Sequence, residues 1–479
     1  MRTGRHAPSG HPAPYSTIPT TDAPNLREAS AVADLFVGVF RRDLAAFYPS
    51  LQFAVDTDHP PLLTGADGPG FALVADDDAI LRVDLFGLRY RIDLRAGPRH
   101  TAHDLRMVRA IGAVLSLRYQ HLFQINHSSR LELYRGGSED HYVAAFVEPW
   151  AYASTSSRPS RISSTIHTLR TAALSTYENR RVSTGALLLG QDIPNEVAPS
   201  DALPYGVELT ALKSIHRLCD GKRTLFLVDP AGKLVEVVDI ARFAAEIERI
   251  PVHEPEVPCA RDYSAHARAT ERNGNLCLVL SPNQEIKLFA NGSQAFAFAH
   301  GRWRILDPAH KFAVWSRAVG DPKLARVMFQ TALDLAECRQ GGLFVVVDEP
   351  ESAIGKLIAP HDLLADEVPD GPPIELTPGD PLAKRALHYL ARGRSVVDLD
   401  PTVLEAFAGL DGAIATDRTG RLLAFGAILR QDASAPLTTI VEGARTTAAL
   451  IASRFGPVLK ISEDGIVSCF LNGERVWDL

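Results

Sequence analysis

The sequence predicts an α/β protein, with an α+β domain in its N-terminal half and a mixed-sheet α/β sandwich in its C-terminal half. Helical and hairpin patterns alternate along the first half, which is typical of α+β domains. The second half contains the uninterrupted apolar run LFVVV at 343–347. A strand of this kind is usually buried on both faces, between layers of helices. The second half therefore predicts a sheet that helices cover.

Length and composition indicate a multidomain globular protein. The chain has 479 residues, of which 46% are hydrophobic and 22% are charged, and a domain takes up about 150 residues. We therefore expect two or three domains, and the composition excludes wholesale disorder, collagen and coiled coil. The net charge of -7 provides no general basic surface for duplex nucleic acid, so we expect no nucleic-acid partner.

The cysteines and the N-terminus indicate a cytoplasmic setting. The five cysteines are scattered without a CxxC pair, which argues against a disulfide framework and against a structural zinc site. Residues 1–26 are rich in proline and poor in apolar residues, so we predict a disordered tail there and no secretory signal. No apolar run approaches the ~18 residues of a membrane span. We therefore expect a soluble cytoplasmic protein without membrane association.

Residues 27–250 carry the pattern of one α+β domain. Apolar residues recur at helical spacing from Leu35 to Phe47 and again after Thr101. They alternate on both sides of Gly87, which predicts a strand pair or a bulged strand. Further along, the patterns predict a strand at 185–190, a helix around 209–218 and a hairpin at 224–238.

Two stretches lack periodicity, and we interpret them as connecting segments. Residues 154–164 are rich in serine and contain Arg158 and Arg161, so we expect a solvated loop, with a phosphate site as the alternative. Residues 251–273 are rich in Pro, His and charge, which is typical of a linker. The C-terminal domain is therefore expected to span 274–479.

Helix starts in the C-terminal domain are marked by Asp followed by Pro, at Asp321, Asp380 and Asp400. Asp caps the free N–H groups of a helix start, and Pro is preferred at the first helical position. Strands are expected within 276–292, at 343–347, from 411, at 422–429 and within 457–473. These elements together predict an α/β sandwich with a mixed sheet.

Asp411 begins one of the predicted buried strands and is followed by Gly412 and Ala413. A carboxylate in this position can hold a divalent ion, and a glycine lets a ligand approach the backbone. Asp-Gly is also an ordinary turn sequence, and that interpretation stays open.

Residues 443–449, with the sequence GARTTAA, enter a helix that is expected to run to about Phe455. Small residues, hydroxyls and a cation at a helix N-terminus can bind phosphate, because free backbone N–H groups and the helix dipole favour an anion. The alternative is a Thr-capped helix with Arg445 on the surface.

The order of these motifs resembles that of the diadenylate cyclase (DAC) domain, a family that makes cyclic di-AMP. The family's strand Gly-Ala-Leu-Ile-Val is similar to GGLFVVV at 341–347, and its Asp-Gly-Ala motif matches residues 411–413. Its Gly-Thr-Arg-His-Arg-Ala-Ala motif aligns with 443–449, and its Ser-Glu-Glu motif is similar to residues 462–464. The resemblance covers the C-terminal part of the chain.

The resemblance implies a role for each matched residue. Asp411 would be catalytic and would bind the Mg²⁺ or Mn²⁺ that activates the ribose 3′-hydroxyl, and Arg445 would be the second catalytic residue. The implied nucleotide-binding residues are Gly412, Ala413, Gly443, Ala444, Thr446, Thr447, Ser462 and Glu463. In the family two such domains face each other, each with one ATP. A homodimer or higher homo-oligomer is therefore implied as well.

The chain departs from the family pattern at Leu410, Thr446 and Thr447, where the family has histidine or arginine. The family's Arg-His-Arg is Arg445-Thr446-Thr447 here, and the residue before Asp411, commonly His in the family, is Leu410. A hydrogen bond to a charged group typically contributes about 1.5–3 kcal/mol. The resemblance therefore leaves two hypotheses, a cyclase that makes cyclic di-AMP or a related cyclic dinucleotide from ATP, and a catalytically degenerate sensor that binds a nucleotide.

The N-terminal domain and the motif order leave two further interpretations. Residues 27–250 resemble, by domain order alone, the sensor regions that precede some DAC domains, so we expect a sensor domain there that controls the C-terminal domain. The third hypothesis for the whole chain is a structural protein in which the order of the motifs is coincidental. Metal-dependent nucleotide binding would distinguish it from the other two.

Overall fold

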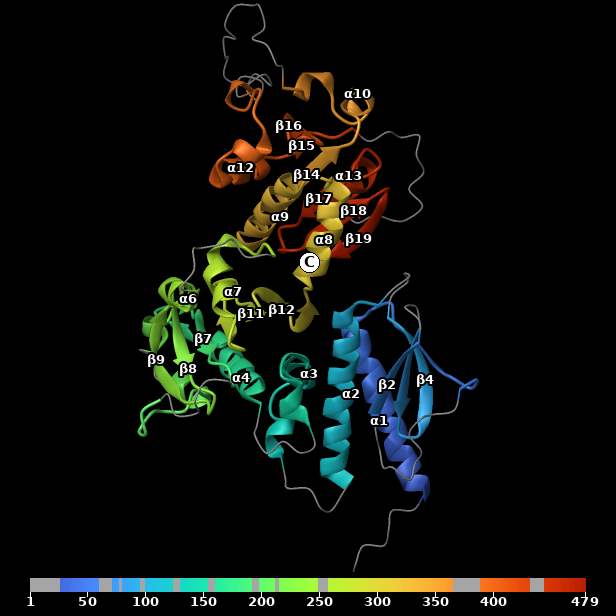
Figure 1. The fold of residues 1–479 in the computed structure, drawn as a ribbon, viewed down its shortest axis with the longest axis vertical. Helices are drawn as coiled ribbons and strands as arrows, with labels where there is room; N and C mark the ends of the chain where they lie inside the picture. Colours follow the sequence, from blue (N-terminus) through green and yellow to red (C-terminus); the bar gives the residue numbers. More distant parts are fainter. Residues whose placement is uncertain are drawn as a thin grey trace, which may run out of the picture. The chain divides into compact units, whose positions relative to one another are not determined.

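The computed structural model describes residues 26–59, 71–76, 80–94, 100–123, 130–153, 160–191, 198–211, 215–248, 257–364, 388–430 and 443–479. The chain divides into two compact units, Met1–Ser129 and Arg130–Leu479 (Figure 1). The fold class is α/β, as predicted from the sequence. Residues 1–25 of the predicted tail and the helix start at Asp380 lie outside the described residues.

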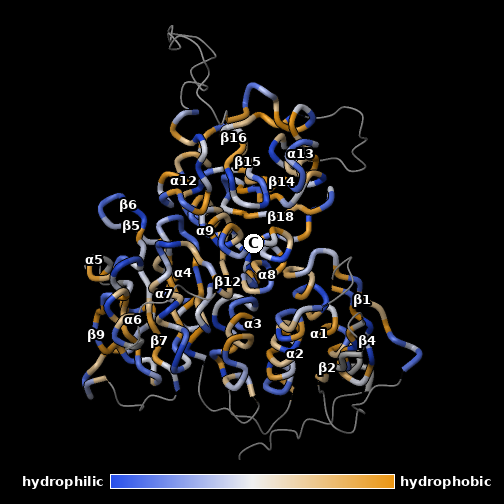
Figure 2. The backbone as a smooth tube through the Cα atoms, turned by 45° about the horizontal axis from the view of Figure 1, so that its top comes forward, coloured by the Kyte–Doolittle hydropathy of each residue, from blue (hydrophilic) through white to orange (hydrophobic). Residues whose placement is uncertain are grey.

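The first unit is a four-stranded antiparallel sheet with two long helices. Its elements are α1 Leu26–Phe47, β1 Gln52–Val55, β2 Phe71–Asp76, β3 Ile80–Leu85, β4 Leu88–Asp93 and α2 Ala102–Phe123. The strand order is β1-β4-β3-β2. Phe86 and Gly87 both have positive φ and form the two-residue turn of the β3–β4 hairpin, which confirms the predicted strand pair. Hydrophilic and hydrophobic residues alternate along α1 and α2 (Figure 2).

The second unit begins with a seven-stranded sheet in the order β13-β12-β11-β10-β7-β8-β9. Its strands are β7 Thr184–Leu188, β8 Thr224–Val228, β9 Leu234–Asp239, β10 Leu276–Leu280, β11 Ile286–Ala290, β12 Ser293–Ala299 and β13 Arg302–Ile305. Its helices are α3 Ser138–Val147, α4 Arg161–Ala173, α5 Ile215–Leu218, α6 Ile240–Glu248 and α7 Ser264–Ala269. A two-stranded ribbon, β5 Thr176–Tyr177 and β6 Arg180–Arg181, precedes β7.

The seven-stranded sheet crosses the domain boundary that the sequence suggests. β10 follows the predicted linker 251–273 and pairs antiparallel with β7, which precedes it, so that Cys277 lies opposite Leu187. Within 257–273, the helix α7 packs on the same sheet. The division at residue 129 thus differs from the expected division into 27–250 and 274–479, because strands far apart in the sequence share backbone hydrogen bonds.

The six-stranded sheet has the order β16-β15-β14-β17-β18-β19 and is mixed, as predicted. Its strands are β14 Gly342–Val347, β15 Ala413–Asp417, β16 Leu422–Ala427, β17 Val458–Ile461, β18 Val467–Leu471 and β19 Glu474–Asp478. Its helices are α8 Pro308–Val319, α9 Pro322–Glu337, α10 Pro350–Ala353, α12 Pro401–Ala408 and α13 Ala444–Ala452. β14 and β15 run parallel, and the other pairs are antiparallel.

Residues of β14 are buried on both faces of this sheet. Phe344 and Val346 pack into the hydrophobic cluster that contains residues of α9 and α12. Val345 and Val347 pack into a second cluster, which contains residues of α13. The apolar run 343–347 therefore forms a central strand between two helical layers, which confirms the predicted sandwich.

The Asp-Pro signals begin helices as predicted. The side chain of Asp321 accepts a hydrogen bond from the backbone N–H of Leu324 at 2.7 Å, and α9 starts at Pro322. Asp400 accepts one from Thr402 at 2.8 Å, and α12 starts at Pro401. These caps satisfy N–H groups that have no partner inside the helix.

Arg161 lies in a helix, whereas the sequence suggests a solvated loop. α4 begins at Arg161, directly after its cap Ser160. The Arg161 guanidinium is buried and donates to Glu148 at 2.6 and 2.9 Å. A buried carboxylate compensates the charge, so this arginine is held within the protein and does not belong to a phosphate site. Residues 154–159 of the same stretch lie outside the described residues.

Candidate functional site

Three segments of the chain meet at one edge of the six-stranded sheet. β14 and β15 are parallel and begin at this edge, and β17 is antiparallel to β14 and ends there. Asp411 precedes β15, and Glu463 follows β17. Arg445 lies in the first turn of α13, which packs against β17. The sheet topology thus brings together three of the predicted site residues that are far apart in the sequence.

The Arg445 guanidinium bridges two carboxylates. Its Nη1 donates to Oε1 of Glu463 at 2.9 Å, and its Nη2 lies 3.7 Å from Oδ1 of Asp411. The Asp411 side chain is 98% exposed and that of Arg445 is 41% exposed. Exposed ion pairs contribute little to stability. A ligand can therefore replace the contacts among these three side chains.

Gly341, which directly precedes β14, lies beneath the Arg445 guanidinium. A Cβ atom at this position would lie 2.2 Å from Nη1 of Arg445 and 2.8 Å from its Cζ. Glycine at 341 therefore allows the cation to lie against the backbone. The sequence analysis used Gly341 and Gly342 only as part of the GGLFVVV strand motif, and this doubled glycine is the signal that could have indicated the close approach.

Gly412 is required by the backbone of β16. Its φ is +115°, and a Cβ atom would lie 2.4 Å from the carbonyl carbon of Gly426. Close approach of a neighbouring strand thus accounts for the absent side chain. Asp411 lies outside any regular strand, and Ala413 is buried as the first residue of β15.

Gly443 forms the entry to α13, with φ of 86° and ψ of 143°, a conformation open to glycine. Having no side chain, it leaves the first N–H groups of α13 without a side-chain cap at this position. The Thr447 hydroxyl donates back to the carbonyl of Gly443 at 3.2 Å, which is one turn earlier. The threonines therefore do not cap the helix, and the interpretation of a Thr-capped helix is wrong.

Ser462 closes the turn between β17 and β18. Its hydroxyl donates to the Asp464 carboxylate and interacts with the carbonyl of Ile466 at 3.2 Å. Burial opposes ionisation of Asp464, but the hydrogen bond from Ser462 and the nearby Lys460 ammonium lower the pKa of this carboxyl. The turn holds Glu463 at its tip, facing Arg445.

A groove of about 1260 Å³ lies beside α13 and the strands β17, β18 and β19. Six predicted nucleotide-site residues line it, namely Gly443, Ala444, Arg445, Thr446, Ser462 and Glu463. Among the described residues of its lining, Asp411, Gly412, Ala413 and Thr447 are not included. The volume suffices for a nucleotide, because ligand pockets usually measure about 300–1,000 Å³.

Lys460 is a cation of this groove that sequence reasoning did not identify. It lies in β17 between Leu459 and Ile461, which face the core on the α9 side of the sheet. Lys460 faces the opposite side and lines the groove. A lysine between buried apolar residues in the strand VLKI was the available signal.

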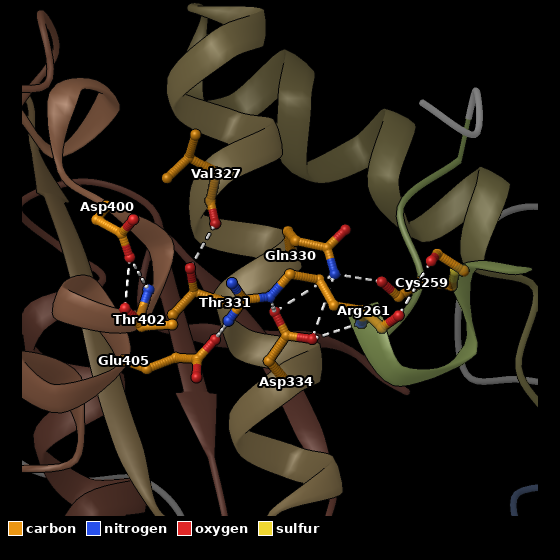
Figure 3. Close-up of polar contacts among 10 residues, drawn as sticks. Cys259, Arg261, Val327, Gln330, Thr331, Asp334, Asp400, Thr402 and Glu405 are labelled. Carbon is orange, nitrogen blue, oxygen red and sulfur yellow. Dashed lines mark hydrogen bonds and ion pairs between the residues drawn. The ribbon is translucent and has the colours of Figure 1, made fainter. Parts of the chain in front are cut away.

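Arg261 connects the segment before the seven-stranded sheet's β10 to the helices of the six-stranded sheet (Figure 3). Its backbone N–H and its Nε donate to Asp334 of α9 at 2.6 and 2.9 Å, and its guanidinium pairs with Glu405 of α12. Burial raises the pKa of Asp334, and the Arg261 interactions oppose that rise. Gln330 of α9 also donates to the carbonyl of Cys259.

In the part of the chain that the structure describes, no group of three His, Cys, Asp or Glu side chains forms a ready metal site. Asp411 by itself can offer one carboxylate to a metal ion. Mg²⁺ is commonly bound by one or two carboxylates together with substrate phosphates, so an exposed Asp411 beside a groove of nucleotide size fits this kind of ion. Nor does any helix of the described residues have the length and apolarity needed to cross a membrane.

Comparison with known proteins gives matches among solved structures. Neither the known protein families nor the curated proteins include a match to the sequence. One similar structure is a hypothetical membrane spanning protein from Bacillus cereus, at 18% identity and a TM-score of 0.23, covering 34% of this chain and 69% of that chain. Another is DacA from Staphylococcus aureus, a diadenylate cyclase, at 17% identity and a TM-score of 0.22, covering 33% of this chain and 89% of that chain.

Proposed function

We propose that this chain is a diadenylate-cyclase-like nucleotidyltransferase that condenses two ATP into cyclic di-AMP or a related cyclic dinucleotide. One observation carries the proposal. Asp411, Arg445 and Glu463 come from three separate segments and meet at one edge of the six-stranded sheet, beside a groove of nucleotide size. A carboxylate, a cation and free helix N–H groups are the parts that phosphoryl transfer uses for positioning and charge stabilisation.

Each of these residues has a role in the proposed reaction. Arg445 exchanges its carboxylate partners for the phosphates of ATP, which lie at the N-terminus of α13, where the N–H groups favour an anion. Asp411 would hold Mg²⁺ or Mn²⁺. Such an ion supplies a positive charge at the α-phosphate and favours ionisation of the ribose 3′-hydroxyl. Glu463, released from Arg445, is available to orient the sugar or the ion.

The reaction requires two nucleotides, and because each chain would bind one of them in this groove, the proposal requires two chains. The 3′-oxygen of each ATP bonds to the α-phosphorus of the other, and the bond from that phosphorus to the β-phosphate bridging oxygen breaks. Two phosphodiester bonds form, two pyrophosphates leave, and each 3′-hydroxyl loses a proton. We therefore propose a homodimer or higher homo-oligomer in which two such sites face each other.

We also propose that the region before the six-stranded sheet controls the site, as a sensor. The Arg261 contacts support this proposal, because they tie the segment leading into β10 to both α9 and α12. α12 ends at Ala408, shortly before Asp411. A displacement of the seven-stranded sheet would therefore act on the loop that carries Asp411.

A nucleotide-binding sensor without turnover is the second candidate. This candidate is favoured because the hydroxyl of Thr447 already donates a hydrogen bond to the backbone carbonyl of Gly443. Neither Thr446 nor Thr447 supplies a charge to a phosphate. A groove that lacks the family's second arginine and its histidine at 446–447 can bind a nucleotide and still stabilise the transition state too weakly for turnover.

The test is incubation of the purified full chain with each NTP, singly and in pairs, with Mg²⁺ or Mn²⁺, and detection of products by mass spectrometry. Asp411→Asn is the site variant, and Asp58→Asn, an exposed turn residue of the first unit, is the matched control. A cyclic dinucleotide that Asp58→Asn retains and Asp411→Asn loses is the expected result. Metal-dependent nucleotide binding without product would favour the sensor, and absence of any nucleotide binding would overturn both candidates.

A further inference from the structure

The ammonium group of Lys460 lies in the groove, and no carboxylate of the described residues comes within ion-pair distance of it. Lys460 is half-buried on β17 and lies directly opposite Ser468 of β18. Both residues line the groove. Among the described residues, no side chain forms an ion pair or hydrogen bond with Lys460 that would occupy its charge. The small Ser468 opposite leaves the ammonium open to the groove.

The surroundings of Lys460 make its positive charge costly when the groove is empty. Burial is the largest cause of a lowered pKa for this lysine, and the cations of Arg475 and Arg445 lower it further. The carboxylates of Asp464 and Asp478 oppose this change from a distance. A partly desolvated ammonium without a partner gains free energy when an anion binds next to it.

Arg445 differs from Lys460 in this respect. The Arg445 guanidinium already pairs with Glu463 and Asp411, and a phosphate must compete with those carboxylates. Lys460 meets no such competition within ion-pair distance. Lys460 is therefore better prepared than Arg445 for an anionic ligand.

We propose that Lys460 binds a phosphate group of the nucleotide in this groove, and so supplies a positive charge that Thr446 and Thr447 do not provide. This inference rests on the proposed function, because it assigns the phosphate contact to a nucleotide in the same site. The ligand chemistry is a polyphosphate. It can be the triphosphate of the substrate or the pyrophosphate that the reaction releases.

The experiment measures binding of ATP, inorganic pyrophosphate and adenosine to the full chain by calorimetry, with Mg²⁺ present. Lys460→Met removes the charge at similar length, and Lys460→Arg keeps the charge. Lys323→Met, an exposed lysine of α9 away from the groove, is the matched control. Thermal unfolding of each variant reports on folding, and Lys460→Gln replaces Lys460→Met if the methionine variant is unstable.

We expect Lys460→Met to weaken the affinity for ATP at least about tenfold, since a hydrogen bond to a charged group is lost. Binding of adenosine should not change, and Lys460→Arg should recover most of the affinity for ATP. A parallel loss for pyrophosphate would assign the contact to the leaving phosphates, and an unchanged affinity for pyrophosphate would assign it to the α-phosphate. Both results support the proposal.

The outcomes separate this inference from the proposed function. If Lys460→Met binds ATP within twofold of the unmodified chain, or loses adenosine affinity equally, the inference is overturned. The proposed function would stand in that case as long as the unmodified chain forms its cyclic dinucleotide. A chain that binds neither ATP nor pyrophosphate would overturn both.

Discussion

The guanidinium of Arg445 donates a hydrogen bond of 2.9 Å to the carboxylate of Glu463, across the junction of α13 with the β17–β18 turn. Both residues line the groove, and Nη2 of Arg445 lies 3.7 Å from Oδ1 of Asp411. The pair is exposed, so it contributes little to stability. The pair instead holds the Arg445 guanidinium at the N-terminus of α13.

Gly341→Ala should displace Arg445 without unfolding the protein. The new methyl group would lie 2.2 Å from Nη1 of Arg445, and the guanidinium is the movable end of a flexible side chain. We expect a loss of ATP affinity of about tenfold, in the range of one charged hydrogen bond, and little change in Tm. Calorimetry and thermal unfolding measure the two effects.

A double-mutant cycle provides the control for Gly341→Ala. If the alanine acts through Arg445, then Gly341→Ala in an Arg445→Met background should cause no further loss of ATP affinity. Additive losses would mean that Gly341 acts on the ligand by another route.

Gly412→Ala should destabilise the protein through its backbone. Alanine at φ +115° is strained, and its Cβ would lie 2.4 Å from the carbonyl carbon of Gly426. Gly301→Ala is a matched control, because Gly301 has φ of +81° and open space around a Cβ atom. We expect about 1 kcal/mol for the control, from φ alone, and a clearly larger loss of unfolding free energy for Gly412→Ala in chemical denaturation. Equal losses would contradict the account of Gly412 as a close contact with β16.

Acidification should destabilise the second unit through His266. Burial lowers the pKa of His266 from 6.5 to about 4, although the hydrogen bond to the carbonyl of Gly221 opposes this shift. The unfolded chain therefore binds a proton between these values that the folded chain does not, so stability is complete above pH 6.5 and falls as the pH decreases toward 4. The loss amounts to about 3 kcal/mol.

His266→Gln tests the assignment of this pH dependence. Glutamine can still donate to the Gly221 carbonyl but does not titrate, so urea unfolding of the variant should lose most of the stability difference between pH 7.5 and pH 4.5. An unchanged difference would assign the acid sensitivity to other groups.

Arg261→Met should destabilise the junction between the two sheets of the second unit. The change leaves the nearly buried Asp334 carboxylate with its Gln330 and backbone contacts only. We expect a loss of about 2 kcal/mol, below the usual range for a fully buried pair because Arg261 is partly exposed. Chemical denaturation provides the measurement.

Two further variants test the Arg261 account. Arg242→Met removes the exposed pair with Glu246, and it should cost at most about 0.5 kcal/mol. Asp334→Asn in the Arg261→Met background should recover part of the loss, because it removes the unpaired charge. Failure to recover any stability would indicate that Arg261 acts through packing of its side chain.

Local signals in the sequence were sufficient for much of the six-stranded sheet. The apolar run 343–347 indicated a strand buried on both faces, and Phe344 and Val345 do pack into clusters on opposite sides. The Asp-Pro pairs at Asp321 and Asp400 indicated helix starts. Such signals work because caps and alternating burial depend on residues a few positions apart.

Sheet membership could not be obtained in the same way. The strands predicted within 276–292 were expected in the C-terminal domain, yet β10 pairs with β7 across the predicted linker. A strand's own residues indicate that it is buried but do not indicate its partner. The strand that it pairs with depends on which edge of the sheet the intervening part of the chain leaves uncovered.

The sequence by itself determined the central strand 343–347, the helix starts at Asp321 and Asp400, and the choice of Asp411, Arg445 and Glu463 as candidates, because motifs and periodicity are local properties. Only the tertiary structure decided that these three side chains meet, that Gly341 makes room for Arg445, and that Lys460 faces the same groove. It also decided that Arg161 is neutralised by Glu148 inside the protein. The physical reason is that charge pairing and cavities arise between segments distant in sequence, where the arrangement of strands sets every distance.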